Sequence, residues 1–350
     1  MRLRKSLGGV HNSNRVLYFD YLNVVACLCV IYMHHNGEAH TYSNSAGWYV
    51  SMVFETICYW AVPVFFMLTG ANLLDYRNKY STRVFFQKRI KKVVIPWISW
   101  LVICAVLKYI KGSLVIDSLG DIVSGIINND FMEIYWFFPA IIMVYLSLPV
   151  LSSLFELNGY RKLFAYMILM TFVFVDCMPY LLYTVGVQMN MDFLFPLDTG
   201  YLQYVLLGYL LSTCKDIKKK NCAMIYFLAV LMCILRYVVT VTSEADEFFF
   251  SYKSFHAFLL ALGVFLLFKS MEKYFLRIPD AVNDWIRKLS ECTMGVYLVH
   301  MIIIYQVVGK IPFMNKLYVW NVLAPIMTYL LSLAVVYALK KIPILRYIVP

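Results

Sequence analysis

Long apolar runs separated by short polar clusters are the main pattern of this 350-residue chain. A run of about 18 to 25 apolar residues forms a helix that crosses roughly 30 Å of hydrocarbon. Ten such runs can be marked, which predicts an all-α, polytopic membrane helix bundle. We place them near 16–36, 47–74, 93–110, 132–154, 162–183, 194–213, 221–241, 248–271, 289–309 and 318–340.

Basic residues are distributed unevenly among the loops between these runs. Of the 31 Lys and Arg residues, 25 fall on the side that holds the N-terminus, whereas the loops of the other side carry acidic residues such as Glu38, Asp117 and Asp121. Basic loops are retained in the cytoplasm, so both termini are expected there. We expect one plasma-membrane domain over 1–350, with a cytoplasmic segment 1–15, the bundle 16–340 and a cytoplasmic tail 341–350.

Composition agrees with this class of protein. Apolar residues make up 62% of the chain and charged residues 15%, whereas soluble domains are about half apolar and a quarter charged. The net charge of +11 is explained by the topology, so membrane lipids are expected partners and nucleic acid is not. The nine cysteines show neither a disulfide framework nor zinc spacing, and no metal is expected.

The longest polar interruption, 111–131, falls on the outer side. Its apolar residues recur among Asp and Ser at the spacing of an amphipathic helix, which favours a helix lying on the outer membrane surface. The same pattern is compatible with a segment that covers a binding site.

Ionisable side chains within predicted spans are costly, and they therefore mark functional candidates. Glu55 in the second run and Arg236 in the seventh lie at similar depth and could pair. Asp176, His256 and His34 also fall in the outer half of their runs. These groups suggest a polar chamber that opens outward. In the alternative interpretation Glu55 and Arg236 form a structural bridge, and the other groups face lipid headgroups.

The first run carries a stripe of polar residues. Asn23 and His34 are eleven residues apart, about three helical turns, so they share one face. Asp20 lies one turn before Asn23, and His35 is turned about 100° away from His34. This stripe would lead from the inner to the outer leaflet, although both histidines could simply be interfacial.

His300 lies near the midplane of the ninth run. A lone histidine at that depth is usually a packed, hydrogen-bonded contact between helices, so we expect a structural role.

A basic segment, 88–97, enters the third run. As a helix it places Arg89 and Lys92 together at i,i+3, with Lys88 nearby, and this fork suits phosphate oxygens. Basic residues beside a span can equally be a topology signal or a contact for anionic lipids.

Six segments, 15–34, 60–70, 89–96, 135–138, 204–209 and 295–300, follow one another in a recognisable order. Together they resemble the signatures of the acyltransferase 3 family of integral membrane O-acyltransferases. Two positions depart from that pattern, because the first-span arginine of the family is Asn23 and the second arginine of its third-span pair is Lys92. Asparagine supplies no charge, and lysine keeps the charge but loses bidentate geometry.

The resemblance implies an enzyme that transfers an acyl group other than an amino-acyl group. Its donor substrate would be cytoplasmic acyl-CoA, most simply acetyl-CoA, with no permanently bound cofactor. The acceptor would be a hydroxyl of a cell-surface glycan or a lipid-linked saccharide, so that the reaction would be an O-acetylation that modifies a polysaccharide.

The resemblance also assigns roles to residues. His34 stands at the histidine position of the family, and a histidine suits the removal of a hydroxyl proton at neutral pH. Supporting or acceptor-chamber residues would be Asp20, Glu55, Asp176, Arg236 and His256, and donor-binding residues would be Lys88, Arg89, Lys92 and Asn23.

Two other functions fit parts of the pattern. An exporter or flippase for a glycan or lipid-linked intermediate would also need an outward polar cavity and paired intramembrane charges. A membrane sensor or scaffold without chemistry would leave the charges of the chamber unexplained.

Overall fold

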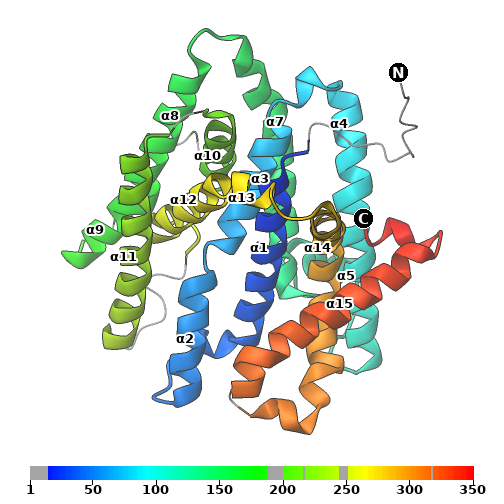
Figure 1. The fold of residues 1–350 in the computed structure, drawn as a ribbon. Coiled ribbons are helices and arrows are strands. Elements are labelled where there is room, and N and C mark those ends of the chain that lie inside the picture. Colours follow the sequence, from blue (N-terminus) through cyan, green and yellow to red (C-terminus); the bar gives the residue numbers. More distant parts are fainter. Residues whose placement is uncertain are drawn as a thin grey trace.

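The computed structural model describes residues 15–187, 200–215, 217–243, 251–316 and 318–350, with positions 189, 195 and 197. These residues are arranged as helices and connecting turns without a β-strand, which confirms the predicted all-α bundle (Figure 1). Residues 1–14 of the expected cytoplasmic segment lie outside the described residues. So do positions 194, 196, 198 and 199 of the run expected at 194–213, and positions 248–250 of the run expected at 248–271.

Within the described chain, eight helical segments are long and apolar enough to cross a membrane. Two further apolar helices, of 12 and 16 residues, fall in the sixth and eighth predicted runs and are shorter than we expected. The chain is therefore a polytopic membrane protein. The eight segments are Leu17–His35, Ala46–Asn78, Thr82–Ile110, Glu133–Glu156, Tyr160–Thr184, Lys219–Ser243, Asp280–Lys310 and Val319–Lys341.

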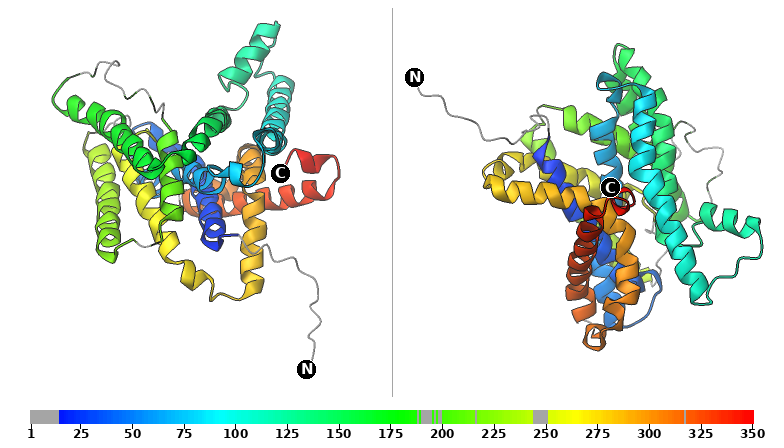
Figure 2. Two further views of the ribbon diagram at one scale, coloured as in Figure 1. Left: turned by 90° about the horizontal axis from the view of Figure 1, so that it is seen from above. Right: turned by 90° about the vertical axis from the view of Figure 1, so that its right-hand side faces the viewer.

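The first helix occupies the middle of the bundle. It lies between α12 and α14 and also contacts α2, α3 and α15 (Figure 2). The described α-helices are α1 (Leu17–His35), α2 (Ala46–Cys58), α3 (Ala61–Leu73), α4 (Thr82–Arg89), α5 (Ile95–Ile110), α6 (Leu119–Ile127), α7 (Phe137–Ser153), α8 (Tyr160–Thr171), α9 (Met178–Thr184), α10 (Leu202–Thr213), α11 (Lys219–Ser243), α12 (Phe255–Ser270), α13 (Glu272–Phe275), α14 (Asp280–Gln306) and α15 (Ala324–Lys341).

In the described part of the chain, three spans contain a π-helical turn, and each turn ends two residues before a proline. The turns are η3 (Ile90–Val94), η6 (Phe172–Cys177) and η10 (Val319–Leu323). The prolines that follow them are Pro96, Pro179 and Pro325, respectively. A proline lacks the N–H for the helical ladder, and its ring clashes with the carbonyl four residues earlier. That carbonyl lies within the π turn in every case, so the wider turn accommodates the proline without ending the span.

Two glycines allow α3 and α10 to pack backbone against backbone. A Cβ atom at Gly70 would lie 1.8 Å from the carbonyl oxygen of Val205, and one at Gly208 would lie 2.0 Å from the carbonyl oxygen of Met67. Small residues of this kind let membrane helices approach closely. This close contact explains why segments 60–70 and 204–209 each contain a glycine.

The predicted amphipathic helix is present as α6, which lies at the edge of the molecule (Figure 2). Ser118 and Asp121 cap its first turn reciprocally. Leu119 and Ile127 are 75% and 68% exposed, and no residue of α6 lines the large internal cavity described below. This arrangement fits a helix on the membrane surface better than a cover for that cavity.

Candidate active site

One cavity of about 1360 Å³ runs along α1. Its lining includes Asp20 in the first turn of this helix and His34 in the last, which are about 21 Å apart at 1.5 Å per residue. The other walls come from α3, α7 and α14, together with the turns η3 and η4 (Glu133–Trp136). Ligands bound at the two ends of α1 would therefore share one continuous space.

His34 lies on the wall of this cavity and is paired with a second histidine. Its Nδ1 is 2.6 Å from Nε2 of His300, and the two ring planes are 10° apart. His300 comes from the C-terminal third of α14 and is fully buried behind the wall. His34 is half-buried, so of the two rings it is the one that a ligand in the cavity can reach.

The contacts of this pair fix the position of each proton in the neutral state. Nδ1 of His300 is 2.7 Å from the carbonyl oxygen of Tyr297, and a carbonyl only accepts, so this nitrogen carries the proton. Nε2 of His300 is then an acceptor, and Nδ1 of His34 must donate to it. The lone pair of His34 is consequently on Nε2, which is the arrangement that a general base requires.

We expected His300 to make a packed, hydrogen-bonded contact between helices, and it does. The sequence did not indicate that the partner is His34, because the two residues are separated by 266 positions. We had counted Glu55 and Asp176 among the residues that would support His34. The structure instead supplies His300, backed by a main-chain carbonyl, as the hydrogen-bond partner of His34 Nδ1.

The neighbouring histidine has a different environment. His35 is 2% exposed, and its Nε2 is 2.8 Å from the hydroxyl of Thr328. Its ring meets that of Trp320 edge to face, and the Trp320 indole donates to the His35 carbonyl. His35 therefore joins α1 to the start of the last span and does not line the cavity.

The opposite end of the cavity is basic. Arg89 and Lys92, which the sequence placed together, both line it, although Lys92 lies within the π turn η3 that begins directly after Arg89. Arg15 and Lys340, which we had not selected for the donor site, line it as well. Lys88 is turned aside, with its ammonium 4.0 Å above the ring of Tyr80, and it does not line the cavity.

Asp20 and Asn23 are both on this part of the wall and are engaged by protein groups. Asp20 accepts hydrogen bonds from Arg15 at 2.6 and 2.9 Å. The bond to Asp20 raises the pKa of the Arg15 guanidinium, so it is charged at any physiological pH. The Asn23 amide donates to both the carbonyl and the hydroxyl of Ser290 and to the hydroxyl of Thr293, which ties α1 to α14.

Glu55 and Arg236, an expected pair, are almost fully buried, and Arg236 Nη2 lies 3.6 Å from Glu55 Oε1. Arg236 also donates to the main-chain carbonyl of Glu55, and its guanidinium lies 3.6 Å from the ring centroid of Tyr59. Glu55 and Tyr59 line the cavity, whereas Arg236 does not. Arg236 is thus a support behind the wall and is not placed to contact a ligand.

The remaining two residues of the expected chamber lie outside the cavity lining. His256 is hydrogen-bonded to Ser254 and stacks on Tyr59, with ring centroids 5.3 Å apart. Asp176 is in η6 and accepts from Gln203 at 2.8 Å. The structure therefore brings His34 and Glu55 to one cavity, and it places Asp176, His256 and Arg236 in buried contacts between helices.

Among the residues that the structure describes, no group of three His, Cys, Asp or Glu side chains could hold a metal ion. The described residues thus form a membrane-spanning bundle that holds a cavity, basic at one end and bearing a histidine pair toward the other. This is a suitable arrangement for a group-transfer protein with two substrates.

The comparison with known families agrees with that class. The acyltransferase 3 model, described as an acyltransferase domain, matches residues 16–341, so the chain belongs to this family and is a membrane acyltransferase. No curated protein and no solved structure matches the chain.

Proposed function

We propose that the protein is a plasma-membrane O-acyltransferase. It moves an acyl group, most simply acetyl, from cytoplasmic acyl-CoA to a hydroxyl of a cell-surface glycan or a lipid-linked saccharide. Both termini lie in the cytoplasm in this proposal, so the basic end of the cavity faces the donor and the His34 end faces the acceptor. The observation that carries the proposal is the single cavity that joins these two ends along α1.

His34 acts as the base in the transfer. Its Nε2 takes the proton of the acceptor hydroxyl while the hydroxyl oxygen forms a C–O bond with the thioester carbonyl carbon. The carbon–sulfur bond then breaks, and the departing thiolate receives the proton from Nε2 of His34. His300 holds the imidazole in the required tautomer and stabilises the imidazolium that forms between the two proton transfers.

The donor end offers cations to the phosphate groups of acyl-CoA. Arg89 and Lys92 both line the cavity, and no ion pair of either residue is found among the described side chains. A cation without a carboxylate partner, beside a cavity in a membrane protein, is a suitable site for an anion.

Aromatic rings along the cavity wall fit a saccharide acceptor. Tyr59 stacks on Tyr252 with ring centroids 4.5 Å apart, and Trp136 stacks on Tyr252 at 5.7 Å. All three residues line the cavity, together with Glu55. Apolar faces with a few fixed polar groups are the usual lining of small-molecule sites, and a sugar ring presents both kinds of surface.

The catalytic assignment is tested in membranes given radiolabelled acetyl-CoA, by following the label into extractable glycans. His34→Ala should abolish labelling, because it removes the base. His35→Gln is the matched control, since His35 is the adjacent histidine, does not line the cavity, and contacts Thr328 through a group that glutamine can replace. Equal labelling by wild type and His34→Ala would overturn the assignment.

The donor assignment has its own matched control. Arg89→Ala and Lys92→Ala should each raise the KM for acetyl-CoA, whereas Lys88→Ala should leave it unchanged because Lys88 faces Tyr80. If all three variants behave alike, the basic segment acts only as a topology signal.

A further inference from the structure

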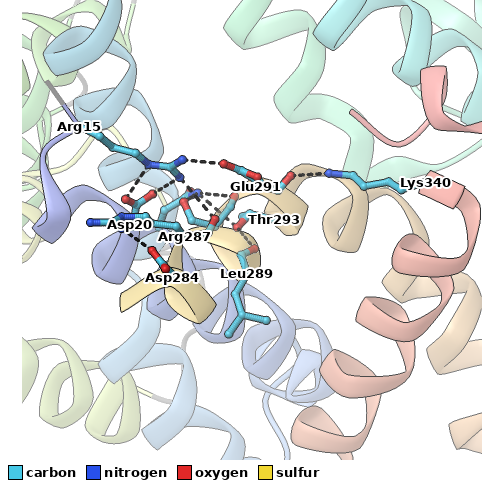
Figure 3. A network of polar contacts seen from close by, with 10 residues as sticks. Arg15, Asp20, Asp284, Arg287, Leu289, Glu291, Thr293 and Lys340 are labelled. Carbon is cyan, nitrogen blue, oxygen red and sulfur yellow. Dashed lines mark hydrogen bonds and ion pairs between the residues drawn. The ribbon is translucent and has the colours of Figure 1, made fainter. Parts of the chain in front are cut away.

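A cluster of charges lies at the basic end of the cavity, where the beginning of α1 meets α14 and the end of α15 (Figure 3). Arg15 contacts Asp20 and also Glu291, with its Nη1 2.6 Å from Glu291 Oε1. Lys340 donates to the main-chain carbonyl of Glu291 at 2.9 Å. Arg15, Asp20, Glu291 and Lys340 all line the cavity.

We propose that Arg15 and Lys340 form a second phosphate-binding site for the nucleotide part of the acyl donor. In this site they supply the positive charge that an arginine at position 23 would otherwise bring. The inference rests on the proposed function, because it takes acyl-CoA as the donor.

Position 23 itself cannot supply this charge. The amide of Asn23 is bound to Ser290 and Thr293, and it serves as a clamp between α1 and α14. The carbonyl of Ser290 accepts from Asn23, and the carbonyl of the next residue, Glu291, accepts from Lys340. The side chain of residue 23 and the Lys340 ammonium therefore bind the main-chain carbonyls of two adjacent residues of α14.

Lys340 has no carboxylate partner among the ion pairs of the described residues. Its ammonium is held in place by the Glu291 carbonyl and also interacts with the thiol of Cys292, which leaves one of its three protons for a ligand. Lys340 also lies in the last turn of α15, where the helix dipole favours a cation. An anionic ligand can thus bind Lys340 without first breaking an ion pair.

Arg15 can reach a ligand by releasing Glu291. The side chain of Glu291 is 58% exposed, so its carboxylate can move into water at low cost, whereas Asp20 is 6% exposed and keeps Arg15 in position. The freed Nη1 would then point toward the phosphate. Four basic side chains at this end, Arg15, Arg89, Lys92 and Lys340, outnumber its two acidic ones, Asp20 and Glu291.

The experiment measures the dissociation constant of desulfo-CoA, which carries all the phosphates but cannot be acylated, on the purified full-length protein. Lys340→Ala should weaken binding by roughly ten- to a hundredfold, the range for one lost hydrogen bond to a charged group. Lys340→Arg should retain most of the affinity. Lys341→Ala is the matched control, because Lys341 is exposed, lies 4.6 Å from the ring of Tyr337 and does not line the cavity.

A second pair of variants tests the equivalence of the two positions. Asn23→Arg in the Lys340→Ala background should recover at least part of the lost affinity. Equal dissociation constants for Lys340→Ala and Lys341→Ala would overturn the proposal and would assign Lys340 to an anionic lipid headgroup or to topology. If wild type itself fails to bind desulfo-CoA, the proposed donor is wrong, which is a different result from failure of the second phosphate site alone.

Discussion

The pairing of His34 with His300 allows a prediction that separates catalysis from packing. In the wild type, His300 Nε2 lies 2.6 Å from His34 Nδ1 and accepts its proton. His300→Ala removes this acceptor but keeps His34 on the cavity wall. His300→Gln retains most of the volume and offers an amide oxygen as a substitute acceptor. Both variants leave the basic end of the cavity, about four helical turns away, unchanged.

The magnitude follows from the change of charge on His34 during the reaction. In the transition state the imidazole gains a proton, and its bond to His300 becomes a hydrogen bond from a charged group, worth ~1.5–3 kcal/mol. Only interactions that strengthen in the transition state raise kcat. Loss of this bond should therefore reduce kcat roughly 10- to 150-fold in His300→Ala. His300→Gln should be reduced less, and the KM for acetyl-CoA should stay within about twofold because no donor contact is lost.

The assay is the steady-state rate of acetyl transfer, measured for each single variant and for the double variant His34→Ala/His300→Ala. Since His300 acts through His34, the double variant should be no slower than His34→Ala alone. Thermal unfolding in the same detergent controls for loss of packing at the buried site. A wild-type kcat in His300→Ala, or additive losses in the double variant, would refute the reasoning.

Two further predictions concern the bundle. Gly70→Ala and Gly208→Ala should each lower the free energy of unfolding by about 1–3 kcal/mol or more, because the new methyl group meets main-chain atoms. Gly37→Ala is the control and should be neutral, since nothing lies within 4 Å of its Cβ position. Thermal unfolding of the purified variants measures these changes. Glu55→Ala should lower the free energy of unfolding by about 3–5 kcal/mol, because it removes the carboxylate that faces the buried Arg236 charge. Equal stabilities of Glu55→Ala and the double variant Glu55→Leu/Arg236→Leu in the same measurement would contradict this account.

Hydropathy was sufficient to predict the class of fold, because a membrane leaves few alternatives to an apolar helix. The same pattern could not show that α10 and α12 are short, since apolar residues continue beyond helical ends. Helical periodicity correctly put Asp20, Asn23 and His34 on one face, and all three line the cavity. These expectations depend on spacing within one helix, where the geometry is fixed by the backbone.

Contacts between distant helices were beyond the reach of the same reasoning. His34 meets His300, and Arg15 meets Glu291 across 276 positions, yet no spacing along the chain encodes either distance. The ionisable residues Asp176, His256 and Arg236 were selected for their depth, but depth does not tell which side of a helix faces a cavity. The orientation of Lys88 depended on one aromatic ring, that of Tyr80, which the pattern of basic residues does not reveal.

The π turn η3 has a consequence for how related chains should be compared. A π turn holds one residue more than the regular α-helical ladder needs, and one residue changes the direction of the following side chains by about 100°. Deletion of a single residue between Arg89 and Pro96 would therefore give a regular α-helix that keeps the directions of both ends, whereas the same number of residues wound without the π turn would rotate one end relative to the other. Equal spacing of basic residues in two such chains is thus no guarantee that their side chains face the same cavity, and the number of residues before the proline has to be compared first.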